Sequence, residues 1–211
     1  MDAAPLPDHY VYPTMDGLVQ IVDNCVEQFK IREFIGLGVG VGANVMLRYA
    51  LQNQSKMDAL ILINCVATSA GWIEWFYQQH LPNPKNLSAF IEAYLNRTPI
   101  SISRDGTMGP KLNVPVLQIV GGDSAFVKDS VELNARLNPA DSEWLKLSGS
   151  GGLVLDDKPE GVAQAIILFL QGRGFVPTTN VQDMIRKISV QSTFDGGEEA
   201  MTVLENVNEM N

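Results

Sequence analysis

One glycine-rich corner constrains the fold of this 211-residue chain more than any other feature. The strand-like residues 34–37 run into Gly38-Val39-Gly40-Val41-Gly42, and a helix-like segment follows at 43–51. Closely spaced glycines let the backbone turn sharply and let a strand and a helix approach each other. The pattern therefore predicts a strand, a tight turn and a helix in direct succession, as in the repeating unit of an α/β sheet.

Short apolar strands alternate with helical patterns along the chain. Strands are expected at 34–38, 59–64, 115–120 and 144–147, and helices at 15–30, 43–51, 127–137 and 160–170. Unbroken apolar runs such as 59–63 are typical of strands that are buried on both faces of a parallel sheet. We therefore predict an α/β fold, a partial parallel sheet with helices on both faces.

The segment between the second and third expected strands is too long for a plain crossover. It spans about 66–113 and is rich in aromatic residues, namely Trp72, Trp75, Phe76, Tyr77, Phe90 and Tyr94. We expect a short helical cap insertion over the carboxyl ends of the strands, where open α/β sheets bind ligands. Packing of these rings onto the sheet is favoured over a ligand cage, because large apolar side chains belong to the core by default.

Residues 1–174 are predicted to form one domain, with the insertion as part of it. Beyond it, residues 175–211 have weak periodicity and no basic residue after Lys187. Such a composition predicts a disordered acidic tail.

Charge and cysteine content exclude several classes of protein. The net charge of −9 and the isoelectric point near 4.6 disfavour binding to nucleic acid or to a bare anionic membrane. Cys25 and Cys65 are too few for a disulfide scaffold, and neither His9 nor His80 has a partner at metal-ligand spacing. We predict a cytoplasmic protein with no transmembrane segment, no metal and no cofactor, and with both histidines on the surface.

The glycine corner matches the position of the G-x-S-x-G elbow of α/β-hydrolases, with Gly40 where the nucleophilic serine would stand. Gly40 has no side chain and cannot attack a carbonyl carbon. The acid position after the third expected strand holds Ser124, one residue beyond Asp123. The histidine position, seven residues before Pro159, holds Gly152. All three triad positions are thus degenerate, and we predict no catalytic residue.

Several further strings occur in a fixed order between residues 10 and 175. They are YPTMD at 12–16, RYAL at 48–51, LIN at 62–64, GWIEW at 71–75, PVLQIVG at 115–121, LNARL at 133–137, SGSGG at 148–152 and FLQGRGF at 169–175. Together with the degenerate triad, this order resembles the N-myc downstream-regulated (NDRG) family, catalytically inactive relatives of α/β-hydrolases. The resemblance implies an α/β-hydrolase-like fold.

The resemblance also implies a role and a partial domain. It implies a non-enzymatic intracellular protein of stress response, differentiation and signalling or trafficking. Such a protein acts through protein partners, and any association with the periphery of a membrane is expected to occur through these partners. The insertion and the tail are the expected contact surfaces. Family members have several strands ahead of the segment that opens here and a longer cap. We therefore expect an N-terminally truncated form in which strand 34–38 is a sheet edge.

Two alternatives come from the residues themselves. Gly38, Gly40 and Ala43 match the G-x-G-x-x-A pattern of dinucleotide-binding folds, but Asn64 stands where a ribose-binding acid is expected. Cys65 is a candidate nucleophile for a hydrolase with a non-standard site, although no base lies near it in the sequence. A residual pocket for a small ligand would be lined near Gly38, Gly40, Cys65, Ser124 and Gly152.

The tail contains one candidate modification site. Arg186 and Lys187 precede Ser189 by three and two residues, as in the sites of basophilic kinases. A phosphate on Ser189 would add about −1.5 to −2 charge units and three strong acceptors, enough to recruit or release a partner. Since short motifs arise often by chance, an unmodified, solvated tail stays the alternative.

Overall fold

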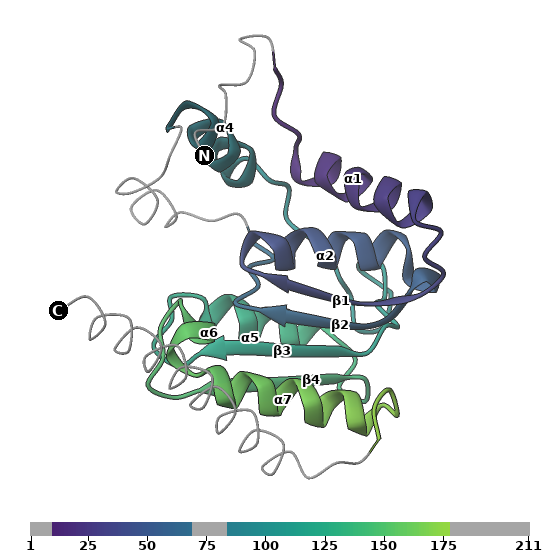
Figure 1. Cartoon of the computed structure of the whole chain (residues 1–211), viewed down its shortest axis with the longest axis vertical. Coiled ribbons are helices and arrows are strands. Elements are labelled where there is room, and N and C mark those ends of the chain that lie inside the picture. Colours follow the sequence, from purple (N-terminus) through teal and green to yellow (C-terminus); the bar gives the residue numbers. More distant parts are fainter. Residues whose placement is uncertain (1–9, 69–83, 178–211) are drawn as a thin grey trace, which may run out of the picture. The chain divides into compact units, whose positions relative to one another are not determined.

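The computed structural model describes residues 10–68 and 84–177, without the side chains of 84–88. The chain forms two compact units, Met1–Lys158 and Pro159–Asn211. The first unit holds a parallel sheet of four strands in the order β1-β2-β3-β4 (Figure 1). The strands are β1 (Phe34–Val39), β2 (Met57–Ile63), β3 (Val116–Gly121) and β4 (Ser142–Leu147).

The first unit contains five α-helices among the described residues. They are α1 (Met15–Gln28), α2 (Val41–Gln52), α4 (Pro84–Leu95), α5 (Val127–Arg136) and the short α6 (Val154–Asp157), with a 3-10 turn η1 (Gln54–Lys56). Helix α2 packs on β1 and β2, α1 packs on α2, and α5 packs on β3 and β4 (Figure 1). The alternation of parallel strands and helices confirms the predicted α/β class.

Helix α1 begins where its sequence predicts and ends two residues early. The Thr14 hydroxyl accepts a hydrogen bond of 3.1 Å from the Gly17 amide, so that Thr14 caps the helix. The prediction extended the helix to residue 30, but α1 ends at Gln28. Lys30 has a φ of 53°, and this left-handed residue closes the carboxyl end of the helix.

The core lies along β2 and β3, whose residues are almost all buried. Strand β1 is an edge of the described sheet, as predicted, and its Leu37 and Val39 side chains are 50% and 42% exposed. Strand β4 is the other edge, and it places the charged residues Glu143 and Lys146 in solvent. Charged side chains on an edge strand disfavour pairing with other chains, and β1 lacks this protection.

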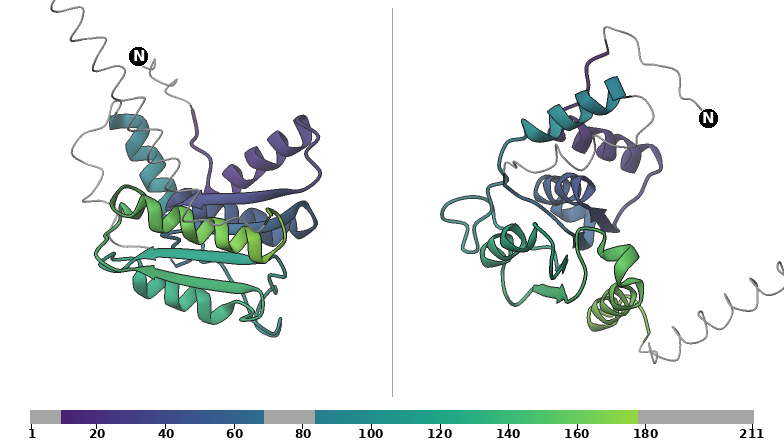
Figure 2. Two further views of the ribbon diagram at one scale, coloured as in Figure 1. Left: turned by 60° about the horizontal axis from the view of Figure 1, so that its bottom comes forward. Right: turned by 90° about the vertical axis from the view of Figure 1, so that its left-hand side faces the viewer.

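The insertion contains the helix that its sequence predicts, α4. Tyr94 on α4 is 2% exposed and belongs to the core cluster, as the packing interpretation of the aromatic residues requires. Trp72, Trp75, Phe76 and Tyr77 lie outside the described residues. Helix α4 and the segment that leads into α1 lie side by side (Figure 2).

The second unit contains α7 (Pro159–Gly172), close to the predicted helix at 160–170. Within this unit the guanidinium carbon of Arg173 lies 5.7 Å from the centroid of the Phe169 ring. Residues 178–211 lie outside the described part, so the acidic tail and the domain boundary at residue 174 stay predictions.

Candidate functional site

The corner between β1 and α2 has the backbone of a nucleophile elbow without its side chain. Gly40 adopts φ 54° and ψ −113°, and its amide donates a hydrogen bond of 2.9 Å to the Ile63 oxygen. A Cβ atom at Gly40 would meet no heavy atom within 4 Å. The corner therefore presents its central residue to open space, but glycine supplies no nucleophile there.

Gly38 allows the strand and the helix to meet at this corner. A Cβ atom at Gly38 would lie 2.5 Å from the Gly42 oxygen and 2.6 Å from the Ala43 Cα atom. Real Cβ atoms do not approach backbone so closely. Close packing of β1 on α2 thus accounts for glycine at this position of the G-x-G-x-x-A pattern, and a bound nucleotide is not needed to explain it.

Asn64, at the end of β2, joins the two neighbouring loops. Its Nδ2 atom donates a hydrogen bond of 2.7 Å to the Gly152 oxygen, and its Oδ1 atom accepts one of 3.3 Å from the Gly121 amide. Asn64 is 2% exposed and has a φ of 50°. From the sequence, Asn64 was interpreted only as standing where a dinucleotide-binding fold has an acid. An asparagine directly after a buried strand was the available signal, because asparagine tolerates the left-handed region better than most residues.

The loops that carry Ser124 and Gly152 are packed against each other. The Asp123 amide donates a hydrogen bond of 2.9 Å to the Ser150 oxygen. The Ser124 hydroxyl accepts a hydrogen bond of 3.1 Å from the Phe126 amide and thereby stabilises the turn before α5. Gly40, Ser124 and Gly152 lie after the ends of β1, β3 and β4, and their assignment as degenerate triad positions stays a prediction.

Cys65, the candidate nucleophile of a non-standard site, is buried. Cys65 is 2% exposed, and burial raises the pKa of its thiol to about 12, while the charge of Arg97 acts in the opposite direction. A buried thiol that stays protonated near neutral pH is a poor nucleophile. His9 and His80, predicted to be surface residues, lie outside the described part of the chain.

The described residues offer no site for a metal and no membrane span. Among them, no group of three or more His, Cys, Asp and Glu residues could hold a metal ion. None of the described helices is long and apolar enough to cross a membrane. Ser189 also lies outside the described residues, and its phosphorylation stays a prediction.

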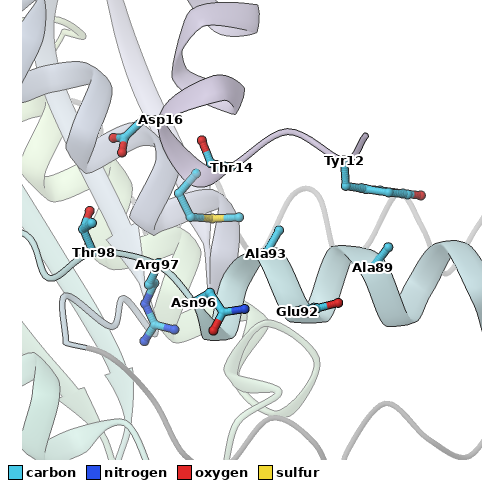
Figure 3. A pocket seen from close by; sticks show the side chains of 10 residues that line it. Tyr12, Thr14, Asp16, Ala89, Glu92, Ala93, Asn96, Arg97 and Thr98 are labelled. Carbon is cyan, nitrogen blue, oxygen red and sulfur yellow. The ribbon is translucent and has the colours of Figure 1, made fainter. Parts of the chain in front are cut away.

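A cavity of about 410 Å³ lies between the residues before α1 and helix α4 (Figure 3). Tyr12 and Thr14 line it together with Met15 and Asp16 at the start of α1. The other lining residues are Ala89, Glu92 and Ala93 of α4 and the following Asn96, Arg97 and Thr98. None of Gly38, Gly40, Cys65, Ser124 and Gly152 lines this cavity. This cavity is therefore not the residual pocket predicted near those five residues, and that pocket stays a prediction.

Comparison with known proteins decides the family. The model of the Ndr family matches residues 1–81 and 78–177. The chain belongs to the Ndr family. NDRG1-A of Xenopus laevis is 30% identical over 223 residues, which cover 87% of this chain and 56% of NDRG1-A. NDRG4-B of Xenopus laevis is 30% identical over 90% of this chain and 63% of its own length. This Ndr-family chain therefore spans little more than half of the relatives it matches.

Solved structures confirm the fold. A thermophilic esterase superimposes with a TM-score of 0.61 at 17% identity, over 79% of this chain and 77% of the esterase. A meta-cleavage product hydrolase (CumD) from Pseudomonas fluorescens IP01 gives a TM-score of 0.60 at 16% identity, over 80% of this chain and 75% of the hydrolase. The chain thus has the predicted partial α/β-hydrolase-like fold, and at these identities the likeness shows the fold alone.

Proposed function

We propose that this Ndr-family chain acts through protein contacts and not through catalysis. The observation that carries the proposal is the carboxyl edge of the sheet, where Gly40, Ser124 and Gly152 stand in place of a nucleophile, an acid and a base. Asn64 supports it, because both polar atoms of its side chain bind backbone groups of the former catalytic loops. Residual acceleration without a triad rests on binding and an oxyanion hole alone.

The family suggests the setting of these contacts. We propose a cytoplasmic protein of stress response, differentiation and signalling or trafficking, which reaches membranes only through partners. The insertion, which includes α4, and the acidic tail are the proposed contact surfaces, and Ser189 is their proposed regulatory site.

An esterase assay tests the absence of catalysis. The purified chain and a Gly40→Ala variant are incubated with p-nitrophenyl acetate and butyrate. We expect both proteins to give the rate of an inert control protein. Gly40 supplies no nucleophile, so filling the corner with the alanine methyl group should change nothing. A rate that saturates with substrate and disappears in Gly40→Ala would show that the corner is catalytic.

The signalling role needs its own test. Cells that lack the protein are complemented with the wild type, with Gly40→Ala, with a chain that ends at residue 177 and with Ser189→Ala, and stress survival and differentiation are scored. We expect Gly40→Ala to complement fully and the shortened chain to fail. If phosphorylation of Ser189 regulates the contacts, Ser189→Ala should also fail, and full complementation by Ser189→Ala would remove this site from the proposal. Full complementation by the shortened chain would remove the tail from the proposal.

A further inference from the structure

We propose that the cavity between Tyr12 and α4 binds a small organic ammonium ion, a protonated amine on an apolar body. The proposal is independent of the role of the carboxyl edge, because no lining residue comes from the glycine corner. A volume of about 410 Å³ lies within the range of about 300–1,000 Å³ that is typical of small-molecule sites.

The apolar part of the ligand has a matching surface. Ala89 and Ala93 are four residues apart on α4 and therefore lie on the same face of the helix. Their small side chains leave room above the helix, and Met15, which is 1% exposed, forms part of the opposite wall. The Tyr12 ring lies at the same end of the cavity as Ala89 (Figure 3). An aromatic face is a favourable neighbour for an ammonium ion.

The accessible charges of the cavity are carboxylates. Glu92 is exposed and lines the cavity, and within the described residues its carboxylate makes no ion pair or hydrogen bond. The Asp16 side chain is 54% exposed, and its Oδ1 atom lies 2.9 Å from Nη1 of Arg48. A cation thus finds one uncompensated carboxylate and a second that is shared with a buried arginine.

The two nearby arginines are bound to protein groups and do not offer an anion site. Arg97 donates from Nη1 to the Tyr94 oxygen at 2.8 Å and from Nη2 to the Thr68 oxygen, and its guanidinium lies 3.9 Å from the Tyr94 ring centroid. In Figure 3 its side chain extends away from Asp16 and Tyr12. The Nε atom of Arg97 has no acceptor among the described residues, but it is buried, so an anion in the cavity could not reach it. These arrangements favour a cation over an anion.

Three phenyl probes of similar size and different charge test the charge of the ligand. The full chain, with alanine methyl groups labelled with carbon-13, is titrated with phenethylammonium, with 2-phenylethanol and with phenylacetate, and binding is followed by NMR. We expect phenethylammonium alone to shift the Ala89 and Ala93 methyl signals in a saturable manner. Equal binding of the alcohol or tighter binding of phenylacetate would overturn the proposal, as would the absence of any shift at millimolar phenethylammonium.

Two charge-matched variants test the residue that recognises the ligand. Glu92→Gln removes the free carboxylate of the cavity, and Glu33→Gln removes an exposed carboxylate from the loop before β1. We expect Glu92→Gln to weaken phenethylammonium binding about three- to fivefold, as for an exposed ion pair, and Glu33→Gln to leave it unchanged. Both side chains are exposed, so both variants should melt at the temperature of the wild type. Equal affinities of the two variants would refute the role of Glu92.

Discussion

The side-chain amide of Asn64 donates a hydrogen bond of 2.7 Å to the backbone oxygen of Gly152. Asn64 follows β2, and Gly152 lies in the loop after β4, at the position predicted to correspond to a hydrolase histidine. The same side chain accepts a hydrogen bond from the Gly121 amide at the end of β3. The Asn64 side chain therefore links the end of β3 to the loop after β4.

Substitution of Asn64 should destabilise the fold. We expect Asn64→Ala to lower the free energy of unfolding by about 1–3 kcal/mol, because the buried Gly121 amide loses its acceptor, the Gly152 oxygen loses its donor and alanine is less tolerant of a positive φ. The measurement is urea denaturation followed by circular dichroism. Asn24→Ala on the exposed face of α1 is the control and should change the free energy of unfolding by less than about 0.5 kcal/mol. Equal values for the two variants would mean that the Asn64 contacts contribute nothing to stability.

Two glycines of the corner should respond in opposite ways to alanine. Gly38→Ala places a Cβ atom 2.5 Å from the Gly42 oxygen, and we expect a loss of about 3 kcal/mol or a protein that does not fold. Gly42→Ala meets open space within the first turn of α2, and we expect a gain of about 0.4–1 kcal/mol. Thermal denaturation of both variants checks the pair. A wild-type melting temperature for Gly38→Ala would contradict the close approach of β1 and α2.

Arg48 should matter more than its ionic partner. It binds Asn44 Oδ1 at 3.0 Å, Asp16 Oδ1 at 2.9 Å and Thr98 Oγ1 at 3.0 Å, and its side chain is 7% exposed. We expect Arg48→Met to cost about 2–3 kcal/mol, since the buried Asn44 oxygen loses its donor and the exposed Asp16 and Thr98 lose theirs in the same step. Asp16→Asn should cost less than about 1 kcal/mol, because Asp16 is more than half exposed. Denaturant unfolding compares the two, and a larger loss for Asp16→Asn would show that the ion pair dominates.

The two cysteines should differ sharply in reactivity. Burial raises the pKa of Cys65 from 9.0 to about 12, whereas Cys25 is exposed. At pH 8 we expect iodoacetamide to modify Cys25 in the native protein and Cys65 only after unfolding, as read by mass spectrometry. Rapid native modification of Cys65 would contradict its burial.

The same pKa shift has a consequence for stability. Between pH 9 and 12 the unfolded chain releases the Cys65 proton and the folded chain keeps it, so the folded state binds more protons there. The Cys65 contribution to stability is therefore complete below pH 9 and decreases as the pH rises through this window. Cys65→Ala should show a smaller loss of stability than the wild type between pH 8 and pH 10.

The elements were predictable from the sequence because their signals are local. Apolar runs predicted all four strands, and helical periodicity predicted α1, α2, α5 and α7. Both patterns are local, because the side chains of a strand or a helix repeat within a few residues. The boundaries of the elements were predicted less accurately. Strand β2 starts at Met57, two residues before the predicted start, and α6 was missed because four residues are too few for a periodic pattern.

The glycine corner and the absence of a side-chain nucleophile at Gly40 followed from residue identity alone, since a glycine in any fold lacks a nucleophile. Only the tertiary structure decided which residues meet at the carboxyl edge of the sheet. The Asn64 contacts with Gly121 and Gly152, the Arg48 contacts with Asp16 and Thr98 and the cavity along α4 all join residues that are far apart in the sequence. Such contacts depend on how the loops and helices meet in space, and no local pattern records them.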